Sequence, residues 1–119
     1  MYSKEVLDHF HHPRNVGEIA SPAAVIEISN PACGDCLKLS VAAGDGRIVE
    51  AKFKVQGCIP AVACASWLTE AITGKALAKV AQLSTEQMET ALGGLPAASH
   101  HASALAIAAL RKALDHLRP

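Results

Sequence analysis

Three adjoining stretches decide the fold: residues 37–41 (LKLSV), residues 44–46 (GDG) and residues 49–55 (VEAKFKV). Apolar and polar side chains alternate through the first and third stretches, and a period of two indicates half-buried β-strands. The glycines between them accept the positive φ angles that a tight turn requires. The sequence therefore predicts a β-hairpin at the centre of the chain.

The position of the turn predicts which residues face each other across the hairpin. If the turn centres near Asp45, the numbers of paired residues sum to about 90. Asp35 then lies opposite Val55, and Cys33 lies opposite Gly57, next to Cys58. The hairpin would thus bring two distant thiols and a carboxylate to one end.

Apolar periodicity predicts a further strand and several helices around the hairpin. The expected elements are a helix over residues 3–11, a strand over 24–28, a buried helix from 58 to 74, a short helix to about 81, a helix from 84 to 93 and a final helix from about 99 to 116. Ser84 and Gln87 form a capping-box pattern. We expect an α+β fold with at least three antiparallel strands, forming a single domain over residues 1–119.

Composition narrows the classes of function. Lys and Arg number 11 and balance 11 Asp and Glu, so nothing indicates a nucleic-acid-binding surface. The apolar stretches are too short for a transmembrane helix, and the N-terminus lacks the pattern of a secretory signal. We expect a cytoplasmic protein without membrane contact, whose four cysteines are free, metal-bound or reactive.

Cysteine and histidine residues stand at predicted helix starts, where free N–H groups create positive potential. Cys58 precedes one helix, and His100 and His101 open another. A thiol in such a position is expected to lose its proton readily, and the thiolate is the form that binds metal. Cys33, Asp35, Cys58 and a histidine could therefore supply four ligands to Zn²⁺ or to an iron–sulfur cluster.

The Cys33-x-x-Cys36 pair leaves a choice between two ligands. In an extended strand Asp35 shares the face of Cys33, whereas Cys36 points to the other face, which favours Asp35. Gly34 could break that alternation, so Cys36 stays open as a substitute ligand. A redox enzyme using Cys33 and Cys36 is a weaker hypothesis, because the βαβ pattern typical of such motifs is absent. Cys64 is expected to be a buried apolar thiol.

These motifs resemble the IscU/NifU N-terminal family of iron–sulfur cluster assembly scaffolds. The resemblance rests on residues 31–35 (PACGD), Gly57-Cys58 before an Ala-rich helix, Leu95-Pro96 before His101, and residues 13–17 (PRNVG). It implies a three-stranded antiparallel sheet with helices packed against it. It also implies that Cys33, Asp35, Cys58 and His101 hold iron in a [2Fe–2S] cluster, or alternatively Zn²⁺.

The resemblance further implies partners and a role without catalysis. Such a scaffold is not an enzyme: it receives sulfur from a cysteine desulfurase and passes its cluster to apo iron–sulfur acceptor proteins.

The chain departs from the family pattern at two places. Ala102 stands where the family has a third ligand cysteine, and residues 95–99 (LPAAS) lack the lysine of a chaperone-recognition loop. These departures argue against delivery to a dedicated chaperone. They also support an alternative, a divergent paralogue that no longer assembles clusters and instead binds zinc or regulates a desulfurase.

Overall fold

The hairpin is present in the computed structural model, which describes residues 2–20, 24–30 and 34–117. Its strands are β2 (Asp35–Gly44) and β3 (Arg47–Gln56), and β1 (Ala24–Asn30) pairs with β2. All pairs are antiparallel, in the order β1-β2-β3. The turn residues Asp45 and Gly46 have φ angles of 55° and 74°, as expected for the Asp-Gly turn.

The pairing register differs from the sequence prediction by two residues. Val55 pairs with Leu37, so paired numbers sum to 92 and not to 90, and Asp35 does not face Val55. Two features account for the difference. The turn centres between Asp45 and Gly46, so the paired numbers next to it sum to 91, and a register shift between Ala42 and Ala43 leaves Val49 as an extra residue on β3 and raises the sum to 92. From Ala51 onward the predicted faces of β3 are correct, whereas Val49, predicted to share the inner face, is 57% exposed and Ile48 is buried in its place.

The helices lie close to their predicted positions. They are α1 (Lys4–His11), α2 (Ile59–Ile72), α3 (Leu77–Val80), α4 (Thr85–Ala91) and α5 (His100–Leu117), with a 3-10 turn (Ala97–Ser99) immediately before α5. The Ser3 side chain caps α1 by accepting a hydrogen bond from the Val6 N–H. Both hydrogen bonds of the predicted Ser84–Gln87 capping box are formed at α4.

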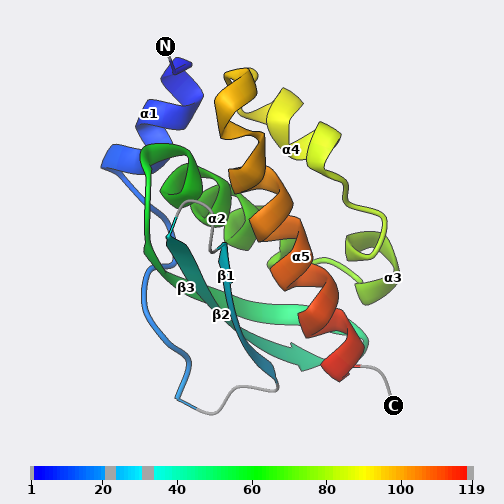
Figure 1. Ribbon diagram of the computed structural model, residues 1–119. Helices are drawn as coiled ribbons and strands as arrows, with labels where there is room; N and C mark the ends of the chain where they lie inside the picture. Colours follow the sequence, from blue (N-terminus) through cyan, green and yellow to red (C-terminus); the bar gives the residue numbers. More distant parts are fainter. Residues whose placement is uncertain (1, 21–23, 31–33, 118–119) are drawn as a thin grey trace.

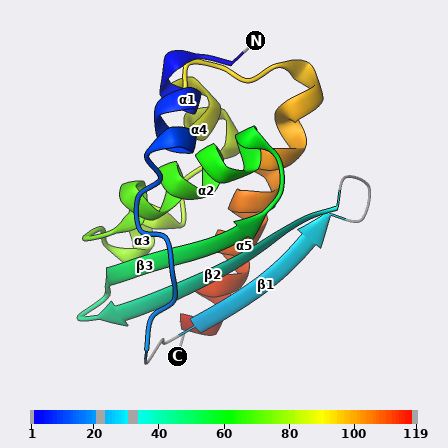
Figure 2. The ribbon, with the colours of Figure 1, turned by 90° about the vertical axis from the view of Figure 1, so that its left-hand side faces the viewer.

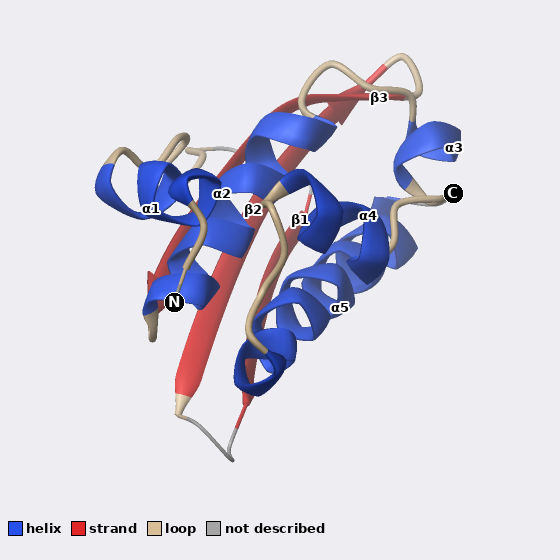
Figure 3. Cartoon of the chain, turned by 90° about the horizontal axis from the view of Figure 1, so that it is seen from above, coloured by secondary structure: helices blue, strands red, loops and turns tan. Residues whose placement is uncertain are grey.

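The helices form a layer against one face of the sheet. Helix α2 packs on β3, α5 packs on β1 and β2, and α2 and α5 contact each other (Figures 1 and 3). Helix α1 packs against α2 and α4 against α5 (Figure 2). The fully buried side chains between the layers include Leu37, Leu39, Phe53, Leu68 and Leu110. Removal of each of these side chains from water stabilises the folded chain by about 1.5–3 kcal/mol. The arrangement of one three-stranded sheet and a helical layer confirms the expected α+β fold.

The outer edge of β3 is paired along both halves. Near one end, the Asn15 carbonyl accepts from the Phe53 N–H and the Gly17 N–H donates to the Phe53 carbonyl. Near the other, Ile48 exchanges hydrogen bonds with Gly74 and Lys75, beyond the end of α2. These bonds fix α2 to the sheet at its C-terminal end. Within the described residues, every helix is too short or too polar to cross a lipid bilayer.

Candidate functional site

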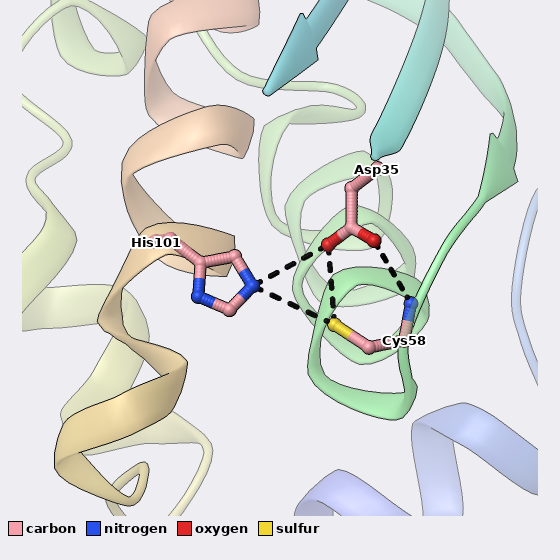
Figure 4. Close-up of side chains that lie close together, drawn as sticks. All are labelled: Asp35, Cys58 and His101. Atoms are coloured by element: carbon pink, nitrogen blue, oxygen red, sulfur yellow. Dashed lines mark hydrogen bonds and ion pairs between the residues drawn. The ribbon is translucent and has the colours of Figure 1, made fainter. Parts of the chain in front are cut away.

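Three segments that are far apart in the sequence converge at one end of the sheet. Asp35 is the first residue of β2, Cys58 is the residue before α2, and His101 lies in the first turn of α5. One potential ligand atom from each lies within 4.8 Å of the others (Figure 4). This is the one such group of three or more His, Cys, Asp or Glu side chains among the described residues.

Asp35 is the buried centre of this group, with 3% of its surface exposed. Its Oδ1 accepts a hydrogen bond from the Cys58 backbone N–H at 3.2 Å. Its Oδ2 lies 3.2 Å from Cys58 Sγ and 3.4 Å from His101 Nε2. Asp35 shares the inner face of β2 with Leu37 and Leu39, so the alternation that favoured it over Cys36 is correct.

His101 is held with one ring nitrogen turned toward Asp35 and Cys58. Its Nδ1 lies 3.0 Å from the Ala98 carbonyl oxygen in the 3-10 turn. Because a carbonyl only accepts, Nδ1 carries the proton, and the neutral ring then has its lone pair on Nε2. That nitrogen lies 3.7 Å from Cys58 Sγ. An imidazole oriented in this way is prepared to bind a metal through Nε2.

The Cys58 thiol retains its proton more strongly than the sequence predicted. Burial raises its pKa, and the Asp35 carboxylate raises it further, while the Ala61 N–H at the helix start lowers it. The expectation of an easily deprotonated thiol is therefore wrong. The helix start does favour the thiolate, but burial and the neighbouring negative charge outweigh it.

The other described cysteines, and Ala102 at the family's third cysteine position, lie outside this group. Cys33 falls outside the described residues. Cys36 is half-buried, between Ser29 and Gln56 on the neighbouring strands, and does not belong to the group of three. Cys64 is fully buried, as expected, and burial raises its pKa to about 12. Ala102 is buried in α5, beside His101 in the sequence.

A second group of side chains supports the first turn of α5 and was not predicted. Glu89 on α4 accepts a hydrogen bond from His100 Nδ1 at 2.8 Å and another from Ser103 Oγ at 2.5 Å. Burial raises the pKa of Glu89, but these two hydrogen bonds outweigh it and hold that pKa below its ordinary value. The sequence places His100 in a first turn but contains no signal for a partner eleven residues earlier.

His9 on α1 makes another interior contact that was not predicted. It is buried, and its Nδ1 lies 2.8 Å from Ser66 Oγ on α2. Burial lowers its pKa, and the Arg14 charge lowers it further. The available signal was its spacing, because His9 follows the apolar Val6 by three residues and therefore shares its face of α1.

With this geometry in view, comparison with known proteins decides the family. The family model described as "NifU-like N terminal domain" matches residues 1–118. The chain belongs to the NifU-like N-terminal domain family. Its Archaeoglobus fulgidus relative, named iron–sulfur cluster assembly scaffold protein IscU 1, is 41% identical over 119 residues, which are 99% of this chain and 78% of the relative.

Further members of the NifU-like family agree with this assignment. The Rickettsia prowazekii protein named iron–sulfur cluster assembly scaffold protein IscU is 38% identical, over 95% of this chain and 88% of its own length. A crystal structure of a NifU-like protein (N-terminal) from Brucella abortus superposes with a TM-score of 0.79 at 18% identity, over 97% of this chain and 92% of that chain. At this identity the structural comparison supports the fold alone, and the assignment to the family rests on the sequence comparisons.

Proposed function

We propose that this protein is an iron–sulfur cluster assembly scaffold that holds its cargo at Asp35, Cys58 and His101. The observation that carries the proposal is the convergence of a carboxylate, a thiol and an imidazole from three distant segments within 4.8 Å. These donor types are those that iron and zinc accept in proteins. Cys33 is proposed as the fourth ligand, on the basis of the family resemblance.

The chemistry of the three side chains favours a divalent cation over a proton. Cation binding releases the Cys58 proton to solvent, and the resulting thiolate and the Asp35 carboxylate together balance two positive charges. The third ligand atom is the Nε2 of His101, which binds through its lone pair. The site thus binds iron or Zn²⁺ more tightly as the pH rises through the range in which Cys58 gives up its proton.

The assembly role implies a sulfur source and a recipient. We infer that a cysteine desulfurase supplies sulfur, that the product is a [2Fe–2S] cluster, and that apo iron–sulfur proteins receive it. The chain acts as a carrier and not as an enzyme, in the cytoplasm, without nucleic-acid or membrane partners. Because residues 95–99 lack the lysine of the IscU pattern, delivery proceeds without a dedicated chaperone.

Anaerobic reconstitution tests this proposal. The protein is incubated with ferrous iron, cysteine and a desulfurase, and visible absorption, metal content and transfer to an apo-ferredoxin are measured. A transferable, sulfide-dependent chromophore is expected, and it should be lost in a Cys33→Ser, Cys58→Ser double variant. Full cluster occupancy in that double variant would refute the ligand assignment. The matched thiol control is Cys36→Ser, which should keep the chromophore unless Cys36 replaces the absent cysteine.

Ala102 favours a second candidate function, a divergent family member that binds zinc or regulates a desulfurase. A methyl group at this position supplies no thiol for a cluster or a persulfide. This candidate predicts tight zinc binding without a chromophore, and no gain of cluster yield in an Ala102→Cys variant. A large gain in that variant would instead show that the missing thiol alone limits assembly.

A further inference from the structure

The Glu89 carboxylate joins α4 to the first turn of α5 at two points. One oxygen, Oε1, lies 2.8 Å from His100 Nδ1, and the other, Oε2, lies 2.5 Å from Ser103 Oγ. The Glu89 side chain is 18% exposed, whereas the His100 side chain is 56% exposed. Both oxygens of one partly buried carboxylate therefore form hydrogen bonds to a single helical turn.

The two contacts lie on either side of His101. His100 precedes it directly, and Ser103 follows it by two residues, so the turn that carries His101 is held at both ends. The His101 ring is in turn held by the Ala98 carbonyl, which belongs to the 3-10 turn leading into α5. Glu89 itself touches neither Asp35 nor Cys58 through any contact that the structure records.

We propose that Glu89 is a positioning residue for His101, because its carboxylate fixes the helical turn that directs His101 Nε2 at the metal site. This inference rests on the proposed function, since it names a residue that prepares the same site for its cargo. Partners bonded directly to a metal-binding imidazole hold it in one orientation, and their loss weakens metal affinity by about 10- to 100-fold. Glu89 acts one residue further away, through the helical turn, so we expect a smaller effect.

The effect of removing the carboxylate follows from the two contacts. Ser103 keeps a second acceptor, the His100 carbonyl at 3.0 Å, so its buried hydroxyl stays paired and the helix still forms. His100 loses its side-chain contact with Glu89, and the first turn of α5 is free to fray. The His101 ring then samples orientations in which Nδ1 no longer meets Ala98, and fewer of them point Nε2 toward Cys58.

The experiment compares three variants with the wild-type chain. Glu89→Ala removes both contacts, and His100→Ala removes the exposed half of the pair with little risk to folding. The control is Glu86→Gln, an exposed residue one turn earlier on α4. Zinc affinity is measured by competition with a chromophoric chelator. The protonation of the His101 ring is measured in the metal-free protein by ¹⁵N NMR of the imidazole.

We expect Glu89→Ala to lower zinc affinity by up to about 10-fold, the lower end of the effect of a directly bonded partner, and to replace the single Nδ1–H form of His101 by a mixture of forms. His100→Ala should change both quantities in the same direction but less, and Glu86→Gln should change neither. An unchanged His101 signal in Glu89→Ala would overturn the inference, as would a drop in thermal stability without any change of that signal. If the wild-type chain itself binds no zinc, the proposed ligand set fails, while the imidazole measurement still tests the role of Glu89.

Discussion

A β-carbon on Gly57 would lie 2.5 Å from Oδ1 of Asp35, a separation that real β-carbons do not show. Gly57 precedes Cys58 and packs against the carboxylate that accepts the Cys58 N–H. The requirement for glycine here is one of space, because Gly57 is not among the glycines with positive φ. The absence of one side chain therefore makes room for the Asp35 carboxylate.

The first prediction follows from this contact. Gly57→Ala should push the Asp35 carboxylate away from Cys58 and lower zinc affinity about 10- to 100-fold, because a supporting contact of the site is lost. Isothermal titration calorimetry provides the measurement. Gly44→Ala is the matched control, since its β-carbon would meet Val49 at an ordinary 3.8 Å. Equal affinities in the two variants would contradict this reading.

The second prediction concerns the Asp35 charge and the Cys58 thiol. Asp35→Asn keeps the size of the side chain but removes the negative charge that helps to raise the pKa of Cys58. Cys58 should therefore react with iodoacetamide at least several-fold faster at pH 8, measured by peptide mass mapping of the metal-free protein. Asp45→Asn, in the exposed hairpin turn, should leave the rate unchanged. A slower reaction in Asp35→Asn would reverse the assigned role of the carboxylate.

The third prediction concerns stability in alkali. Burial, followed by the Glu89 and Cys58 charges, raises the pKa of Cys64 from an ordinary 9.0 to about 12. Above pH 9 the unfolded chain loses this proton while the folded chain keeps it, so stability falls as pH rises. Between pH 9 and 11 the wild-type chain should lose up to about 3 kcal/mol more unfolding free energy than Cys64→Ala, at about 1.36 kcal/mol per unit. Urea titrations at several pH values measure the free energy of unfolding. In the control Cys36→Ala, that free energy should fall with pH as steeply as in the wild type.

The fourth prediction concerns stability in acid. Burial lowers the pKa of His9 from its ordinary value of 6.5. Below pH 6.5 the unfolded chain binds a proton at His9 that the folded chain does not bind. The contribution of the neutral His9 to the free energy of unfolding is therefore complete above pH 6.5 and is lost as pH falls. A His9→Gln variant should show a shallower loss of stability between pH 6.5 and 5 than the wild type. His11→Gln, at an exposed position of the same helix, should follow the wild-type curve; identical slopes in all three proteins would count against a buried neutral His9.

The fifth prediction concerns Ser66, the partner of His9. Ser66 Oγ also accepts the Arg14 backbone N–H at 2.9 Å, so one buried hydroxyl joins α1 and the segment after it to α2. Ser66→Ala leaves both groups without this partner and should cost about 1–3 kcal/mol of unfolding free energy. Chemical denaturation provides the value. The control is Ser29→Ala on the exposed face of β1, where a change within about 0.5 kcal/mol is expected.

Local chemistry explains which features were predictable from the sequence. The Asp45-Gly46 turn, the Ser84 cap and the placement of Asp35 on the inner face of β2 all depend on neighbouring residues, and each is confirmed. The register was wrong because the exact centre of the turn and the irregularity at Ala42/Ala43 both depend on how the two strands fit together.

Contacts between distant elements explain what was missed. The Glu89 contacts join α4 to α5, and the His9–Ser66 contact joins α1 to α2, so no local pattern records them. The raised pKa of Cys58 was missed for a related reason, since it depends on how deeply the folded chain buries the thiol.

The separation of the three donor residues along the chain has a consequence for biosynthesis. Asp35, Cys58 and His101 come together only when α5 has packed against the sheet, and α5 is the last helix of the described chain. A nascent chain emerging from the ribosome therefore has scattered donors and no site until that helix docks. Once the site exists, any ion that it captures stabilises the folded chain over the unfolded one by mass action. The supply of metal would then determine two things: which cargo a newly made molecule carries, and how long that molecule survives proteolysis.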